Sequence, residues 1–442
     1  MGVNGASGKP RVAVVLPGGG TRGAYEAGAL SVLLPALEAR GEEVTIACGT
    51  SVGAINAGHL AATAHLPAAE QAEAGLTTWR TMRRGDVLSP LVSPALPVRA
   101  LRMLGNLLDL PGPQLSSVLD PSPMQASLER WIDWEDLHRN VRTGVMEAVC
   151  VVATSLSAGG PVAFVERTRR KAGSPGSAMP SSEEIRYVRT MLAPEHVRAS
   201  AAIPLLFPPV AVEAPRAAAG SYIDGGTRLN SPIKPAIQLG ADRVIVIGFE
   251  PFTRGAPAAP RPEAPALADV MANVLDGLLV DQVASDLSRM AAVNQFFVHE
   301  QGGGASVYRS SRGRAPYRKV SYALVCPEEK GEIGALAEDV FQRRHGGWKG
   351  LRDIDFALMS RVLGSRARSR GELLSFLFFD PVFVEELMEL GQRDANRWLA
   401  RHPNVWCSDR DHDFPVDHGG LATAREQSVV SEFRDHARMR LR

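Results

Sequence analysis

The sequence predicts an α/β protein with a mostly parallel central sheet flanked by helices. Two successive strand–turn–helix units near the start of the chain support this prediction. In the first unit, the short apolar run Val12–Leu16 reaches a proline and three glycines, and a helical pattern then extends from about Arg22 to Ala39. In the second, Val44–Cys48 leads through the turn at Gly49–Gly53 into a helix that begins near Ala54. Short apolar strands alternating with helices are typical of a sheet covered on both faces.

Further strands are expected downstream, and the last quarter of the chain has a helical pattern. The strand candidates are Glu147–Thr154, Pro161–Val165, Tyr222–Asp224, Arg243–Gly248 and Val320–Cys326. Beyond them, Phe376–Arg401 is the clearest amphipathic stretch. Residues 86–122 are rich in Leu, Pro and Ser, and residues 251–266 have the Pro/Ala-rich composition of a surface linker. We therefore expect one α/β domain over residues 10–330 and a helical C-terminal extension over residues 331–442.

The composition excludes several classes of protein. The 442 residues include 49 Lys and Arg against 48 Asp and Glu, so the net charge of +1 attracts neither nucleic acid nor an anionic membrane. The four cysteines have no CxxC spacing, which favours a reducing compartment over a disulfide scaffold. The longest uncharged stretch, Val44–Ala69, carries Gly, His and Pro, which a lipid-facing helix would exclude, and the N-terminal residues lack a signal-peptide pattern. We expect a cytoplasmic protein whose contact with membranes is peripheral at most.

The first motif that can carry chemistry is Gly18–Gly23, which follows the first predicted strand. Its sequence, GGGTRG, fits the G-x-G-x-x-G pattern of a dinucleotide-binding loop. Glycines let backbone N–H groups approach a ligand, so the same loop suits a phosphate or an oxyanion. The nucleotide interpretation also needs an acidic residue after the second strand, where Cys48 and Gly49 stand instead. A nucleotide site and a purely structural turn remain as alternatives.

The second motif is Gly49-Thr50-Ser51-Val52-Gly53, a G-x-S-x-G pattern between a predicted strand and a predicted helix. Such a turn lifts the serine hydroxyl above the sheet and directs the dipole of the following helix toward it. The alternative is a structural turn in which the serine caps the helix. The position of the motif between a buried strand and a helix favours a nucleophilic serine.

A nucleophilic serine needs a base within hydrogen-bonding reach. Asp224-Gly225-Gly226 directly follows a predicted strand, although Asp-Gly-Gly is also a common turn sequence. His299 lies after Asp224 and would complete the Ser…Asp…His order of many α/β-hydrolases. His299 is therefore the leading candidate for a classical triad with Ser51 and Asp224, although no sequence feature around His299 supports that role.

Taken together and in order, these three motifs resemble the patatin-like phospholipase family. The matching segments are GGGTRG at 18–23, GTSVG at 49–53 and DGG at 224–226. Further agreement comes from Ala199–Val210 upstream of the DGG motif, from Asn230-Ser231-Pro232 after it, and from the C-terminal segment Phe378–Ala395. The resemblance implies a three-layer α/β/α fold and a serine lipid acyl hydrolase that uses a Ser–Asp dyad.

The resemblance also implies a role for each residue of the motifs. Ser51 would be the nucleophile and Asp224 the general base, and partial desolvation would raise the pKa of Asp224 enough for that role. The backbone amides around Gly18, Gly19 and Gly20 would form the oxyanion hole, with Arg22 supporting that loop. The remaining glycines of the motifs would allow the tight turns: Gly23, Gly49, Gly53, Gly225 and Gly226. Neither a metal nor a cofactor is implied, and the expected partner is a lipid, met transiently at a membrane or lipid aggregate.

Other sequence features leave alternatives open. The segment 86–122 suits either a surface loop or an amphipathic lid, and deletion of a lid would affect aggregated lipid more than soluble ester. The His, Cys and Asp side chains within 402–418 miss the known metal-binding spacings, so a solvated loop is expected there. Two other functions remain possible for the whole chain: a catalytically silent lipid-binding module and a nucleotide-binding enzyme. The sequence does not indicate an oligomeric state.

Overall fold

The structure is a computed structural model that describes six parts of the chain. They are residues 9–89, 120–169, 179–204, 206–251, 320–345 and 367–407, with the backbone alone described for 367–370. The expected linker at 251–266 and most of the segment 86–122 lie outside the described residues, as does His299.

The described strands form one mixed sheet of nine strands, in the order β5-β4-β3-β2-β1-β8-β9, with β7 added beside β3 and β6 beside β7. Their bounds are β1 (Val12–Leu16), β2 (Val44–Thr50), β3 (Ala148–Ser155), β4 (Pro161–Arg167), β5 (Arg186–Arg189), β6 (Val210–Val212), β7 (Gly220–Asp224), β8 (Arg243–Ile247) and β9 (Ser321–Val325). The strands β3, β2, β1, β8 and β9 are parallel, whereas β4 and β7 run antiparallel to β3. The predicted mostly parallel sheet is therefore confirmed.

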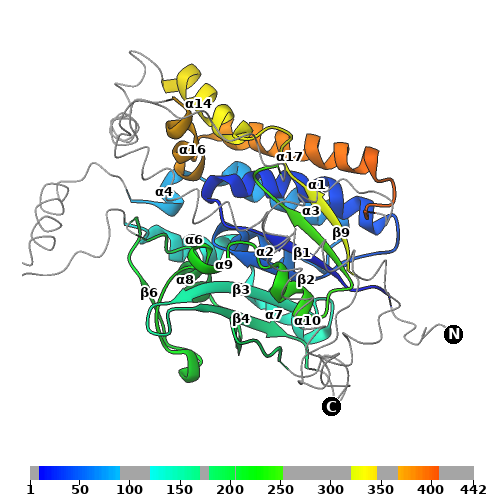
Figure 1. Ribbon diagram of the computed structural model, residues 1–442, viewed down its shortest axis with the longest axis vertical. Helices are drawn as coiled ribbons and strands as arrows, with labels where there is room; N and C mark the ends of the chain where they lie inside the picture. The colour runs from blue at the N-terminus through cyan, green and yellow to red at the C-terminus, as the bar shows by residue number, and fades with distance from the viewer. Residues whose placement is uncertain are drawn as a thin grey trace, which may run out of the picture.

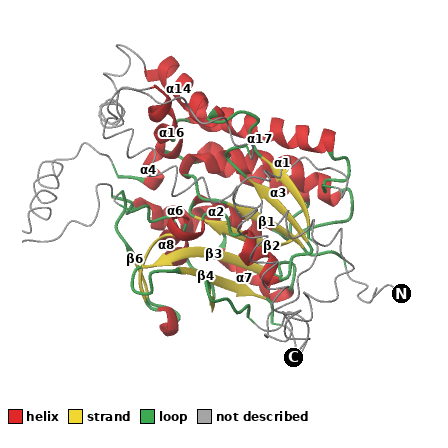
Figure 2. Cartoon of the chain, in the orientation of Figure 1, coloured by secondary structure: helices red, strands yellow, loops and turns green. Residues whose placement is uncertain are grey.

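Helices cover the sheet (Figures 1 and 2). The N-terminal and middle helices are α1 (Gly23–Glu38), α2 (Val52–Thr63), α3 (Ala68–Thr81), α4 (Arg84–Val87), α6 (Pro123–Trp131), α7 (Trp134–Thr143), α8 (Pro194–Ser200), α9 (Gly226–Leu229) and α10 (Ile233–Leu239). The C-terminal helices are α14 (Glu332–His345), α16 (Ala367–Leu377) and α17 (Pro381–Arg401), and two 3-10 turns are η1 (Gly20–Arg22) and η2 (Arg216–Ala218).

The strand β1 shows why the sheet is buried on both faces. Val12, Val14 and Leu16 belong to one apolar cluster together with side chains of α1, α2 and α17. Ala13 and Val15 belong to a second cluster, on the other face, together with side chains of α10. Because side chains alternate along a strand, a continuous apolar run such as this one supplies both clusters.

Two short strands, β5 and β6, are not predicted from the sequence. The strand β5 (RYVR) has only four residues and carries an arginine at each end, and β6 (VAV) has only three residues. Both lie at margins of the sheet, where β5 pairs with β4 alone and β6 pairs with β7 alone. Pairing with a neighbouring strand determines their conformation, since their own sequences carry little strand signal.

The amphipathic stretch 376–401 is two helices instead of one. The helix α16 ends at Leu377 and α17 begins at Pro381. The Asp380 carboxylate accepts a hydrogen bond of 2.8 Å from the amide of Val382, which caps the new helix. A proline at the first helical position lacks the N–H that would continue the preceding helix, so the chain changes direction there.

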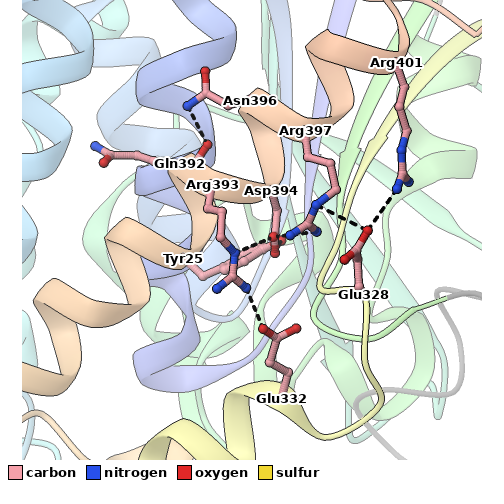
Figure 3. A network of polar contacts seen from close by, with 9 residues as sticks. All are labelled: Tyr25, Glu328, Glu332, Gln392, Arg393, Asp394, Asn396, Arg397 and Arg401. Carbon is pink, nitrogen blue, oxygen red and sulfur yellow. Dashed lines mark hydrogen bonds and ion pairs between the residues drawn. The ribbon is translucent and has the colours of Figure 1, made fainter.

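The helix α17 packs along α1, and the two contact through glycines and a buried polar group. A Cβ on Gly391 would lie 2.2 Å from the carbonyl oxygen of Tyr25, so the helix backbones nearly touch. The Tyr25 hydroxyl donates a hydrogen bond of 2.9 Å to Asp394, which Arg393 and Arg397 also contact (Figure 3). The helical C-terminal region therefore shares the core of the α/β sheet.

Within the described residues, the helices are too short or too polar to cross a lipid bilayer. The uncharged stretch Val44–Ala69, which is long enough to span one, instead forms β2 and α2 and enters α3.

Replacing Gly391 with alanine is expected to lower the free energy of unfolding by about 1–3 kcal/mol, because an added methyl group forces α17 away from α1. The matched control is Gly75→Ala in α3, where a Cβ meets nothing within 4 Å. There alanine improves helix propensity, and the free energy of unfolding should rise by up to about 1 kcal/mol. Urea unfolding followed by circular dichroism measures both changes, and a gain in stability for Gly391→Ala would contradict the close approach of the helices.

Candidate active site

Ser51 occupies a strained turn between β2 and α2. Its backbone φ is 55° and ψ is −124°, a conformation that a non-glycine residue rarely adopts. The two motif glycines make the turn possible, since a Cβ on Gly49 would lie 2.1 Å from the Gly53 carbonyl oxygen, and a Cβ on Gly53 equally close to that of Leu16. The turn places Ser51 at the carboxyl end of β2, where ligands of open α/β sheets bind.

Asp224 reaches Ser51 through the pairing of β7 with β3. Thr50, the last residue of β2, pairs with Val152, and Asp224, the last residue of β7, pairs with the next residue, Ala153. β2 and β7 therefore meet end to end along β3, and residues that follow one strand lie beside residues that end the other. Ser51 and Asp224 are 173 positions apart in the sequence and neighbours in the fold.

Burial controls the charge of Asp224. The side chain has no exposed surface, and desolvation raises its pKa from 3.8 to about 7, against the opposing effects of the Ser51 hydroxyl and the Gly226 amide. The Gly226 amide donates a hydrogen bond of 2.7 Å to Oδ1. Among the described residues, Oδ2 has no partner that meets ordinary hydrogen-bond geometry. The Ser51 hydroxyl nevertheless lies close enough to lower the pKa of the carboxyl, so the two groups are near each other without being aligned. Contacts of catalytic groups are often loose without a bound substrate.

Ser200 connects the serine turn to the strand that carries Asp224. Its hydroxyl accepts a hydrogen bond of 2.8 Å from the Ser51 amide and donates one to the Val152 carbonyl. Its own carbonyl accepts from the amide of Gly225 at 3.2 Å. Ser200 lies in the segment Ala199–Val210, but no role for it is visible in the sequence, because nothing in a helical segment indicates a partner about 150 residues away.

The glycine loop lies against the same turn. The amide of Gly18 donates a hydrogen bond of 2.8 Å to Oδ1 of Asn230, whose Nδ2 returns one of 3.3 Å to the Gly18 carbonyl. A Cβ on Gly18 would be only 2.9 Å from that of Ser51, so the loop and the serine are in contact. The Gly18 amide is therefore occupied, whereas no hydrogen bond from the amide of Gly19 or Gly20 to another described residue is found. Within the described residues, the expected oxyanion role therefore stays a prediction for Gly19 and Gly20, whereas the Gly18 amide is already bonded to Asn230.

Arg22 is fully buried next to this loop. Its guanidinium contacts α16, which lies 350 residues further along the chain, through Glu372 and Ser375. Arg22 is expected to support the loop, but its partners Glu372 and Ser375 cannot be identified from the sequence, since nothing in the polar pattern of α16 distinguishes them from surface residues.

The described residues bear on only part of the other chemistries considered, since His299 lies outside them. Asp224 has no histidine among the partners found for it. No group of three or more His, Cys, Asp or Glu side chains in these parts of the chain is arranged to hold a metal ion. Of the polar segment 402–418, only residues 402–407 are described. A groove of about 520 Å³ lined by residues of α2, α3 and α6 shares no residue with the site around Ser51.

Comparison with known proteins covers the part of the chain that contains Ser51 and Asp224. The model of the patatin-like phospholipase family matches residues 14–237, just over half of the chain, and confirms the resemblance inferred from the motifs. The search of curated proteins gave no match. Among solved structures, the chain is similar to VipD from Legionella pneumophila, with a TM-score of 0.32 and 14% identity, covering 89% of this chain and 67% of that one.

The strain at Ser51 predicts an unusual order of stability. Ser51→Gly should be more stable than Ser51→Ala by about 1 kcal/mol, because glycine adopts a positive φ without the steric penalty of a Cβ. In the regular helix α2 the order reverses, and Ala62→Gly should cost about 1 kcal/mol relative to alanine. Thermal unfolding of the three variants tests this, and an alanine variant more stable than the glycine variant at position 51 would show that the turn is unstrained.

Proposed function

The chain belongs to the patatin-like phospholipase family, and on this basis we propose that it is a serine hydrolase that cleaves acyl ester bonds of lipids. The family implies lipid acyl hydrolase activity. The finer proposal assigns Ser51 as the nucleophile and Asp224 as the general base, with no metal or cofactor. Candidate reactions are those of a phospholipase A, a lysophospholipase or an acylglycerol lipase.

In the proposed first step, Ser51 attacks the carbonyl carbon of the ester. The Ser51 Oγ forms a bond to that carbon while its proton passes to the Asp224 carboxylate. The carbonyl oxygen becomes an oxyanion, which the amides of Gly19 and Gly20 stabilise at about 3–4 kcal/mol for each well-placed donor. Collapse of the tetrahedral intermediate breaks the ester bond, and the departing alcohol takes the proton from Asp224.

In the second step, water releases the fatty acid from the acylated serine. Asp224 accepts a proton from the water as it attacks the acyl carbon, and returns the proton to the Ser51 oxygen as the acyl bond breaks. The same carboxylate therefore acts as base and as acid in each half of the reaction. A group with a pKa near the working pH performs both roles most effectively.

The observation that carries this proposal is the buried Asp224 beside a strained serine. An ordinary surface aspartate has a pKa of about 4 and is a weak base. Burial raises the pKa of Asp224 to about 7, which suits proton transfer from a serine hydroxyl at neutral pH. A structural turn needs neither a desolvated carboxylate nor an unpaired buried oxygen, and both incur a free-energy penalty.

The proposed encounter with lipid is transient. With 49 basic and 48 acidic residues, the chain has little electrostatic attraction to anionic lipid. Contact would therefore depend on apolar surface at the mouth of the site. Two other functions predict different results: a silent member of the family would bind lipid without hydrolysing it, and a nucleotide-binding enzyme would be stabilised by nucleotide and would not be labelled at Ser51.

A fluorophosphonate probe should label the wild-type protein covalently at Ser51. Ser51→Ala removes the nucleophile and should abolish labelling. Asp224→Asn keeps the size of the side chain but replaces the carboxylate that accepts the proton, and it should slow labelling by about 10³-fold or more. Ser231→Ala is a matched control, because Ser231 is also fully buried near the DGG motif but has no proposed role. Circular dichroism establishes that the protein is folded, and mass spectrometry measures the label. A wild-type protein that is folded but unlabelled would contradict the proposed hydrolase function.

The raised pKa of Asp224 predicts the pH dependence of hydrolysis. Only the ionised carboxylate accepts the Ser51 proton, so kcat/KM for a soluble short-chain ester should fall about tenfold per pH unit below pH 7 and level off above it. Activity falls toward low pH because desolvation favours the neutral acid and so raises the pKa of Asp224. Steady-state assays from pH 5 to pH 9 measure the profile. A flat profile between pH 5 and pH 8 would rule out Asp224 as a base with this pKa.

A further inference from the structure

Arg22 belongs to the glycine loop, yet its guanidinium is fully buried. A buried charge is costly unless a partner neutralises it and satisfies its hydrogen bonds. Glu372 of α16 supplies that partner, with 2.6 Å between Nη2 of Arg22 and Oε2 of Glu372. The Nε of Arg22 donates a hydrogen bond of 2.8 Å to Ser375, and the guanidinium carbon lies 4.1 Å from the centre of the Phe376 ring.

The same helix also contacts the backbone of the loop. The Thr21 hydroxyl donates a hydrogen bond of 3.3 Å to the carbonyl oxygen of Phe376. Gly20 has a φ of +59°, and a Cβ there would lie 2.1 Å from the same carbonyl oxygen. The C-terminal end of α16 therefore forms the surface against which the loop is shaped, and only a glycine fits at this point of contact.

The helix α16 is itself held by its neighbours. A Cβ on Gly371 would lie 2.3 Å from the carbonyl oxygen of Gly334, so α16 and α14 are in close contact. The Phe378 ring, just after α16, stacks on Phe383 of α17 with centroids 5.4 Å apart. Because α17 packs along α1 in the core, the helix α16 that contacts Arg22 is itself packed against core elements.

We propose that Glu372 and Ser375 are positioning residues for the oxyanion loop, acting through Arg22. This inference rests on the proposed hydrolase function. An amide stabilises a developing oxyanion only when it is held at hydrogen-bonding distance from the position that the oxyanion occupies. Glu372 and Ser375 fix the Arg22 side chain, Arg22 and Phe376 fix the loop, and the loop directs the amides of Gly19 and Gly20. The C-terminal helical region would therefore be part of the catalytic apparatus.

The test compares Glu372→Gln with wild type. The change keeps the shape of the side chain but leaves the buried Arg22 without its counter-charge, so kcat for a soluble short-chain ester should fall about 10- to 100-fold. The KM should change less than about threefold, because substrate binding in the ground state does not use the oxyanion. Glu372→Asp keeps the charge and should recover part of the loss, while Ser375→Ala should lower kcat by a smaller factor of about 3–10.

The matched control is Glu385→Gln, which removes one of the two acidic partners of Arg80, the other being Glu73, on the exposed side of α17. It makes the same chemical change in a C-terminal helix without touching the loop, and it should leave kcat within about twofold of wild type. Circular dichroism and thermal unfolding establish that each variant is folded. If Glu372→Gln does not fold, the milder Glu372→Asp and Ser375→Ala decide the question.

A trifluoromethyl ketone of the acyl chain separates positioning from a general structural role. Addition of Ser51 to this ketone forms an oxyanion that the same amides bind, so its inhibition constant should rise by the same factor by which kcat/KM falls. A folded Glu372→Gln variant with kcat/KM and inhibition constant within about threefold of wild type would overturn the inference. An inactive, unlabelled wild-type protein would instead overturn the proposed function, so the two failures are distinguishable.

Discussion

The antiparallel pairing of β7 with β3, just beyond the end of β2, is the constraint on which the rest of the site depends. It brings Asp224 next to the turn that carries Ser51, although the two residues are 173 positions apart. The carboxylate at this strand end has no exposed surface. Desolvation there raises the pKa of Asp224 to about 7, against the lowering effect of the hydrogen bonds from Ser51 and Gly226.

Hydrogen bonds outside the three motifs hold this arrangement. Ser200 joins the Ser51 turn to the backbone beside Asp224, and Asn230 joins the glycine loop to the segment that follows the DGG motif. Each connects loops whose conformations are unusual by themselves, above all the positive φ of Ser51. Strain of this kind persists only where the surrounding contacts determine the backbone more strongly than local preference does.

The C-terminal helices also hold the glycine loop in place through contacts between residues that are distant in the sequence. The helices α14, α16 and α17 lie on one side of the molecule (Figure 1) and share the core of the sheet. The helix α16 also contacts the glycine loop through Arg22. The network around Asp394 fastens α17 to α1 by a buried tyrosine hydroxyl and flanking arginines (Figure 3). The extension predicted from the helical pattern at residue 331 therefore contributes to the core that supports the α/β sheet.

The sequence by itself determined the fold class and most strands, and it made Ser51 and Asp224 the candidate catalytic residues, because apolar runs, glycine turns and short motifs are local signals. Only the tertiary structure decided that Asn230 engages the Gly18 amide, that Ser200 holds the Ser51 turn, and that Glu372 pairs with Arg22. The strands β5 and β6 and the break before Pro381 were missed as well. Those features depend on partners distant in sequence, and the desolvation of a carboxylate depends on everything packed around it.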